Sequence, residues 1–226
     1  MKYNNIVEGI FIERPNRFIA YVEVDGVVNK CHVKNTGRCK ELLIKGVKVY
    51  LEKSDNPNRK TQYSLIAVQK GDILINIDSS APNKVVKEWL EVHTEELGIT
   101  LLKPEKTYNK SRLDFYYETK DKKVYMEVKG VTLLDGDVAR FPDAPTERGI
   151  KHIEHLIELK KQGYETYIMF VIQCKGVKRF EPNDVTHKAF GDVLREAYKT
   201  GVNVVAYDCV VTKQYIEIDK AVRVEV

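Results

Sequence analysis

The sequence predicts a small β-barrel followed by a mixed α/β domain. Five or six short, closely spaced strand patterns occupy roughly the first eighty residues, which is typical of a small barrel. The pattern changes at Ser79–Asn83, and the order beyond it is helix, three strands, helix, strand, helix and strand. We therefore expect one domain over residues 1–80 and a second, α/β domain over residues 81–226.

Strands of the barrel are expected where apolar and β-branched residues lie between turn signals. The Asp25-Gly26 dipeptide separates valine-rich segments at 22–24 and 27–28 and favours a hairpin, because glycine tolerates positive φ. Residues 47–51 alternate apolar and polar side chains. Segments 63–68 and 73–77 flank a further turn, and the polar segment 54–60 is expected to be a loop.

The second domain begins with a helix that starts at Asn83 and keeps apolar residues at helical spacing until Gly98. We then expect strands at 99–102, 112–118 and 123–130, a helix at 146–162, a strand at 166–173, a helix at 184–200 and a strand at 202–207. Each of these two helices is ended by a glycine.

Composition excludes several classes of protein. The 226 residues include 43% hydrophobic and 31% charged side chains, which is typical of a globular chain and not of a disordered one. No apolar run approaches the length needed to span a bilayer, and no signal peptide is present, so a cytoplasmic protein is expected. The 4 cysteines are scattered and predict neither a zinc site nor a disulfide scaffold. A net charge of +4 is compatible with a nucleic-acid partner.

The segments 112–118 and 123–130 are the most informative about function. If residues 119–122 form a hairpin loop, Glu118 faces Lys123, Asp114 faces Glu127 and Arg112 faces Lys129. This register gathers the apolar side chains on one face, namely Leu113, Phe115, Tyr117, Val124, Met126 and Val128. The other face then collects Arg112, Asp114, Tyr116, Tyr125, Glu127 and Lys129.

Two carboxylates side by side need a positive partner. Mg²⁺ prefers such oxygen ligands and takes one or two carboxylates with water and substrate phosphate, so Asp114 and Glu127 are candidate metal ligands. Lys129 is then placed to stabilise a transition state or orient the nucleophile. Glu88 and Glu105 are candidates for a third carboxylate. The alternative is a salt-bridge network in which Arg112 and Lys129 neutralise the pair, with Glu88 and Glu105 in solvent.

Two groups of basic residues are candidates for phosphate contacts. Thr146 is expected to cap a helix whose first amides, with Arg148 and Lys151, form an anion site. Ordinary helix packing is the alternative, and we expect His152 and His155 to be structural. Six further cations surround the barrel, with tyrosines among them, and are typical either of a nucleic-acid surface or of a solvated face: Arg14, Arg17, Arg38, Lys40, Arg59 and Lys60.

Four motifs in order give the sequence a strong resemblance to the sugar fermentation stimulation protein A family. They are Asn35-Thr36-Gly37-Arg38-Cys39-Lys40-Glu41-Leu42-Leu43 with Arg59-Lys60-Thr61, Ser111-Arg112-Leu113-Asp114-Phe115, Glu127-Val128-Lys129-Gly130-Val131-Thr132-Leu133, and Phe141–His152. The resemblance implies an OB-fold barrel followed by an α/β domain of the PD-(D/E)XK nuclease type. It also implies non-specific DNA binding and a role in regulating sugar-utilisation genes.

The nuclease pattern maps its acidic position onto Asp114 and its (D/E)-x-K segment onto Glu127-Val128-Lys129. The helix carboxylate typical of that superfamily falls on Glu88. The sequence departs from the literal pattern because Leu113, not proline, precedes Asp114, and Pro142-Asp143 lies after the lysine.

These observations together predict a DNA-binding protein that is not embedded in a membrane, with a phosphodiester-hydrolysing centre dependent on Mg²⁺ or Mn²⁺. Asp114, Glu127 and Lys129 are the predicted catalytic residues, and Asp114, Glu127 and Glu88 the predicted metal ligands. Arg112 joins the eight basic residues named above as a predicted DNA contact. Two alternatives remain open at this point. One is a regulator that binds DNA without catalysis, and the other is a hydrolase of smaller phosphate esters.

Overall fold

The computed structural model of the protein describes residues 1–35, 37–108 and 111–226. Thr36, part of the first motif above, lies outside the described residues. The first domain contains the strands β1 (Ile6–Glu13), β2 (Ile19–Val24), β3 (Val27–Val33), β4 (Lys48–Lys53), β5 (Tyr63–Lys70) and β6 (Ile73–Asn76).

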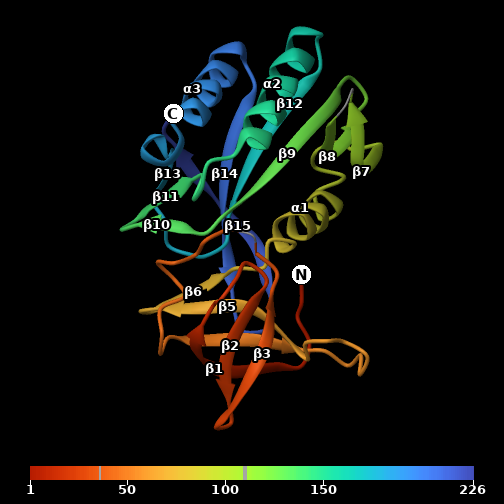
Figure 1. Cartoon of the computed structure of the whole chain (residues 1–226). Helices are drawn as coiled ribbons and strands as arrows, with labels where there is room; N and C mark the ends of the chain where they lie inside the picture. The colour runs from red at the N-terminus through yellow and green to blue at the C-terminus, as the bar shows by residue number, and fades with distance from the viewer. Residues whose placement is uncertain (36, 109–110) are drawn as a thin grey trace.

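The first five strands close into a barrel, as predicted (Figure 1). Strands pair in the order β3-β2-β1-β4-β5-β6, and a parallel pairing between β3 and β5 completes the ring. The expected hairpin forms at Asp25-Gly26, where both residues have positive φ of 51° and 77°. Such a turn matches the twist of the strands that it joins.

The second domain is a mixed sheet flanked by three helices. Its elements are α1 (Ala81–Val92), β7 (Leu101–Tyr108), β8 (Ser111–Glu118), β9 (Lys123–Val131), β10 (Leu133–Asp135), β11 (Val138–Phe141), α2 (Glu147–Lys161), β12 (Glu165–Ile172), β13 (Arg179–Pro182), α3 (Asp184–Thr200), β14 (Asn203–Val211) and β15 (Ile216–Val224). The strand order is β10-β11-β13-β15-β14-β12-β9-β8-β7.

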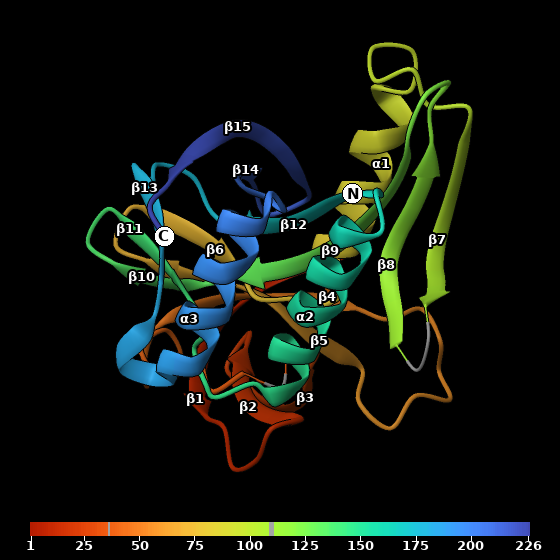
Figure 2. The same ribbon diagram turned by 90° about the horizontal axis from the view of Figure 1, so that it is seen from above.

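Helices cover both faces of the central strands (Figure 2). On one face α1 packs its Val85, Val86 and Leu90 against side chains of β8 and β9. On the other face α2 and α3 pack against β9, β12 and β14. Of these parallel neighbours, β9 and β12 are buried on both faces over most of their length and β12 reads as a nearly continuous apolar run, whereas burial alternates along β14.

Several boundaries differ from those expected. Helix α1 begins at Ala81, with Pro82 in its first turn, and ends at Val92. The following strand is residues 101–108 and not 99–102. The strands β10, β11, β13 and β15 were not predicted. The first three have only three or four residues each, and β15 is mostly exposed, so its periodicity is weak.

The β8–β9 hairpin has the predicted register at its loop end. Glu118 pairs with Lys123, and pairing continues to Phe115 and Met126. The expected division into one apolar and one polar face is wrong, because α2 covers the second face. Tyr116 and Tyr125 are 6% and 7% exposed and pack together there, and Leu113 joins their cluster instead of that of Phe115.

Close contacts join the two domains. Gln173 at the end of β12 donates to the side chain of Asn76, and Gly37 after β3 lies against Asp143. The four cysteines are all buried free thiols, and burial raises the pKa of Cys39 to about 11. Within the described ranges, no helix has both the length and the apolarity needed to cross a membrane.

Candidate functional site

The site is centred on Glu127 and Lys129 of β9. Alternation along the strand places both side chains on the face covered by α2. Glu127 is only 2% exposed, and its Oε1 accepts hydrogen bonds from Lys129 Nζ at 2.5 Å and from His152 Nδ1 of α2. Its other oxygen, Oε2, is buried and has no hydrogen-bond partner among the described residues. One half of this carboxylate is therefore held firmly, while the other half is available.

The surroundings of Glu127 favour its charged form. Burial alone would raise the pKa of this carboxyl group. The hydrogen bond from His152 and the charge of Lys129 outweigh burial, so the pKa lies below its usual value. Glu127 is accordingly a carboxylate at neutral pH.

The start of α2 determines where His152 lies. The Thr146 side chain accepts a hydrogen bond from Gly149 N at 3.1 Å, so the predicted cap is present. A Cβ atom at Gly149 would lie 2.9 Å from Thr146 Cγ2 and 3.3 Å from a ring carbon of Phe190 in α3. Helix packing therefore explains this glycine, and His152 then falls on the buried stripe that faces β9.

Asp114 of β8 lies where the hairpin ladder ends. Its Oδ2 accepts from the backbone N–H of Val128 at 2.8 Å, and its Oδ1 accepts from Asn83 Nδ2 of α1 at 2.7 Å. The expected direct pairing of Asp114 with Glu127 is absent from the described strand pairs, which end at Phe115 and Met126. The side chain of Asp114 takes the place of a backbone partner for β9.

The two carboxylates nevertheless influence each other. Burial is the largest cause of the raised pKa of Asp114, and the negative charge of Glu127 raises it further. The Val128 N–H, Lys129 and Asn83 oppose this shift without cancelling it. A buried carboxylate close to a partly buried one is more stable with a cation beside it.

The structure does not bring either candidate third carboxylate to this pair. Glu88 lies five positions after Asn83 on α1, on a different face of the helix, and contacts the amino group of Met1. Glu105 is exposed and forms an ion pair with Arg112 at 3.3 Å. The expected position of Arg112 opposite Lys129 is also absent from the described pairings, since Arg112 pairs with Thr107 of β7.

Eight of the nine basic residues predicted to contact DNA are divided among separate places, and the ninth, Arg112, forms the ion pair with Glu105 described above. Four line a groove between the barrel and residues 141–146, namely Arg14, Arg17, Arg38 and Lys40. Arg59 Nη2 donates to Ser64 Oγ on the barrel, and Lys60 is exposed nearby in the sequence. Arg148 Nε donates to His152 Nε2 at 3.4 Å. Lys151, on the same helix, is exposed.

Sequence reasoning missed two residues that contact the pair. Asn83 was recognised only as a helix start, although it donates to Asp114. His152 was expected to be structural, although it donates to Glu127. The available signal for His152 was a polar, titratable residue on the apolar stripe formed by Ile153 and Leu156.

The oxygen atoms around Glu127 suit a cation that takes only some of its ligands from the protein. Among the described residues, no three His, Cys, Asp or Glu side chains converge as a complete metal cage requires. Mg²⁺ needs only one or two carboxylates, with water and phosphate as its other ligands. Asp114 and the unpartnered Oε2 of Glu127 meet that requirement.

Comparison with known protein families gives two matches along the chain. Residues 12–77 match the SfsA N-terminal OB domain, and residues 80–215 match the sugar fermentation stimulation protein RE domain. They confirm the predicted OB-type barrel followed by a mixed α/β domain.

Relatives of similar length cover nearly the whole chain. A sugar fermentation stimulation protein homolog from Ruminiclostridium cellulolyticum is 59% identical over 224 residues, which are 99% of each chain. A homolog from Clostridium beijerinckii is 59% identical over 218 residues and 96% of each chain. The solved structure of Pyrococcus furiosus SfsA in complex with Ca²⁺ has a TM-score of 0.87 and 27% identity, covering 100% of this chain and 98% of its own.

Proposed function

This chain belongs to the sugar fermentation stimulation protein family, and we propose that it binds DNA and hydrolyses phosphodiester bonds with Mg²⁺ or Mn²⁺. The observation that carries the proposal is Glu127 Oε2, a buried carboxylate oxygen with no hydrogen-bond partner among the described residues, near a second, partly buried carboxylate, Asp114. Buried polar atoms without partners are rare in proteins, because each forfeits its hydration. A divalent cation held by Asp114 and Glu127 would satisfy this oxygen and offset the repulsion between the two carboxylates.

The solved relative supports a divalent cation as the ligand. The Pyrococcus furiosus protein was determined in complex with Ca²⁺, and it shares the fold of this chain along its whole length. Ca²⁺ and Mg²⁺ both prefer oxygen ligands, although Mg²⁺ keeps more of its water. We therefore assign Asp114 and Glu127 as the protein's ligands and leave Glu88 out of the set.

A bound Mg²⁺ or Mn²⁺ would lower the pKa of water and neutralise charge on a phosphodiester. The chain's own groups have separate parts in the reaction. Lys129 directs its ammonium at Glu127 and is 16% exposed, so it is placed to donate to a phosphate oxygen as negative charge develops there. His152 holds Glu127, while Asn83 and the Val128 N–H hold Asp114. His152 and Asn83 are thus positioning residues.

The alternative function is a regulator of sugar-utilisation genes that binds DNA without cutting it. The observation that favours it is the ion pair of Lys129 with Glu127 Oε1, which neutralises much of that charge within the protein. Glu127 Oε2 favours the enzyme, because a DNA-binding surface has no need of a buried carboxylate oxygen that no group in the described part of the chain contacts.

Cleavage assays distinguish the two functions. Supercoiled plasmid and single-stranded DNA are incubated with Mg²⁺ or Mn²⁺ and with the wild type, Asp114→Asn or Lys129→Ala. We expect the wild type to cut, and each variant to lose about 100-fold or more in rate while still binding DNA. Glu88→Gln is the matched control and should cut normally. DNA binding without cleavage in either metal would leave the regulator as the function.

Cation binding is measured separately from activity. Mn²⁺ or Ca²⁺ at 100 times its dissociation constant should stabilise the folded wild type by about 2.7 kcal/mol. Asp114→Asn should lose most of this gain in thermal unfolding. An equal gain in the variant would show that the cation binds elsewhere.

A further inference from the structure

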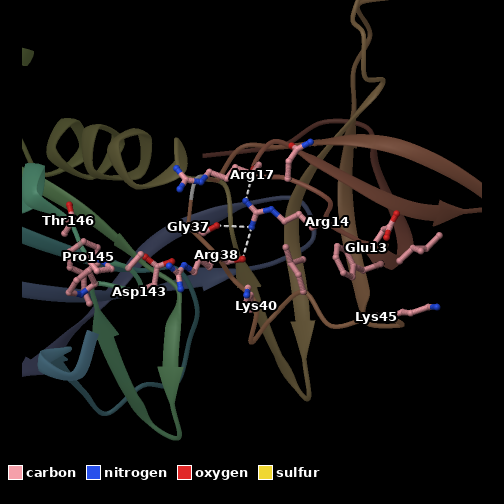
Figure 3. Close-up of a pocket in the computed structure, with 17 residues that line it drawn as sticks. Glu13, Arg14, Arg17, Gly37, Arg38, Lys40, Lys45, Asp143, Pro145 and Thr146 are labelled. Carbon is pink, nitrogen blue, oxygen red and sulfur yellow. Dashed lines mark hydrogen bonds between the residues drawn. The ribbon is translucent and has the colours of Figure 1, made fainter. Parts of the chain in front are cut away.

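A groove of about 830 Å³ lies between the barrel and residues 141–146, the segment that leads into α2 (Figure 3). The barrel contributes one wall, which includes Arg17, Arg38, Lys40 and Lys45. Asp143 and Thr146 belong to the opposite wall. Both domains are needed to form this groove, so it exists only in the whole chain.

The groove carries more positive than negative charge. Arg17, Arg38, Lys40 and Lys45 are exposed, and none of them makes an ion pair within 4.0 Å in the part of the chain that the structure describes. The acidic side chains in the lining are Glu13 and Asp143. The excess of cations favours an anionic ligand.

Arg14 has a different task from its neighbours. Its guanidinium donates to the backbone oxygens of Arg17, Gly37 and Arg38 at 2.7–2.9 Å, and to that of Asn35 at 2.5 Å. These bonds tie the β1–β2 loop to the segment after β3. Arg14 therefore organises the wall, while the side chains of Arg17 and Arg38 extend toward the 141–146 segment (Figure 3).

The cations are spread along the groove and not gathered around one point. Lys45 lies on the other side of the view from the tips of Arg17 and Arg38 (Figure 3). A single phosphate cannot contact all of them, whereas successive phosphates of a strand can. Phe141 in the lining is only half-buried and can lie against a nucleobase, whereas Phe11 and Leu43 are buried core side chains behind the wall.

We propose that this groove binds a short single-stranded segment of nucleic acid, with its phosphates on Arg17, Arg38, Lys40 and Lys45. The inference rests on the proposed DNA binding and names the form of DNA and its place. The volume lies within the range of about 300–1,000 Å³ that holds compact ligands, so it accommodates a few nucleotides but not the width of a duplex. The 141–146 wall leads directly into α2, whose His152 contacts Glu127.

The test measures binding of a fluorescein-labelled oligothymidylate in EDTA, where hydrolysis does not contribute. Removing one cation that binds a phosphate of a single strand lowers the slope of log affinity against log salt by about 0.7. The double variant Arg17→Ala/Arg38→Ala should therefore show a slope smaller by about 1.4 and an affinity about 25-fold weaker near 0.1 M salt. Lys30→Ala/Lys70→Ala is the matched control, since it removes two exposed barrel cations outside the groove, and it should bind as the wild type does.

Competitors identify the ligand. Thymidine monophosphate should not displace the oligonucleotide, because it engages only part of the groove. The proposal is overturned if the groove variant binds the single strand as the wild type does, or if the mononucleotide competes as well as the strand. It is also overturned if the variant loses affinity for duplex alone.

The result is independent of catalysis. Weaker binding by the groove variant, in a protein that cuts no DNA, would support the groove and contradict hydrolysis. Normal binding by that variant, in a protein whose cleavage depends on Asp114, would support hydrolysis and contradict the groove.

Discussion

Gly37 of the barrel lies directly against the carboxylate of Asp143 in the second domain. A Cβ atom at position 37 would come within 2.5 Å of Asp143 Oδ2 and 2.9 Å of Asn35 Oδ1. The Asn35 side chain also accepts from Gly37 N at 2.7 Å, which fixes the local turn. The glycine of the first motif and the acidic residue of the last one therefore meet at the contact between the domains.

Gly37→Ala should destabilise the protein by about 1–3 kcal/mol, because the added methyl group overpacks a close contact. Urea unfolding of the whole chain measures this change. In an Asp143→Ala background the penalty should shrink, since the nearest atom is removed and only Asn35 remains close. Equal penalties in the two backgrounds would show that Gly37 and Asp143 do not interact energetically.

Asp114→Asn should make the metal-free protein more stable at neutral pH. The pKa of Asp114 is raised in the fold, chiefly by burial and then by the charge of Glu127. A raised pKa means that the contribution of Asp114 to stability is present in acid and is lost as the pH rises through the folded-state pKa. The asparagine variant avoids that loss, so its advantage should be largest at pH 7 and vanish below about pH 3.9.

Thermal unfolding in EDTA across this pH range checks the expectation. An asparagine variant that melts below the wild type at pH 7 would contradict it. Saturating Mn²⁺ should reverse the order of the two proteins, because only the wild type then gains the stabilisation from the cation.

His152→Ala should weaken binding of Mn²⁺ by about 10–100-fold, as removal of a partner behind a metal ligand generally does. Glu127 keeps Lys129 but loses the donor that fixes its orientation from α2. His152→Asn can retain a donor near the position of Nδ1 and should recover most of the affinity. Calorimetric titration measures both variants, and unchanged affinity in His152→Ala would remove this residue from the site.

Glu88→Gln and Glu127→Gln form a matched pair of substitutions. Glu88 is half-exposed and contacts the amino group of Met1, so its amide variant should bind Mn²⁺ as the wild type does. Glu127→Gln should lose at least about 10–100-fold in Mn²⁺ affinity, because a buried ligand is altered directly. A loss of affinity in Glu88→Gln would restore Glu88 to the ligand set.

Local patterns were sufficient for much of the fold. The Asp25-Gly26 hairpin, the Thr146 cap of α2, the glycine that ends α3 and the register at Glu118 and Lys123 all depend on neighbours in the sequence. Short strands at the sheet edge were missed because three or four residues carry little periodicity.

The candidate site was predictable in part for the same reason. Alternation along β9 places Glu127 and Lys129 together, whatever the rest of the chain does. The position of Asp114 depends on where the ladder ends, and the role of Asn83 depends on how α1 crosses the sheet. Glu88 was assigned from the resemblance, which supplies a carboxylate on the helix but not the face of α1 that meets β8, and in the structure Glu88 contacts the amino group of Met1.

Cys39 offers a native reporter of domain separation. Its side chain is buried, with the residue 1% exposed, and lies beside Asp143 and Thr132 of the other domain. Alkylating reagents attack the thiolate and need access to the sulfur, so the intact molecule should react with iodoacetamide very slowly. The time course of its modification, followed by mass spectrometry, would thus record how often the barrel separates from the second domain, without any engineered label.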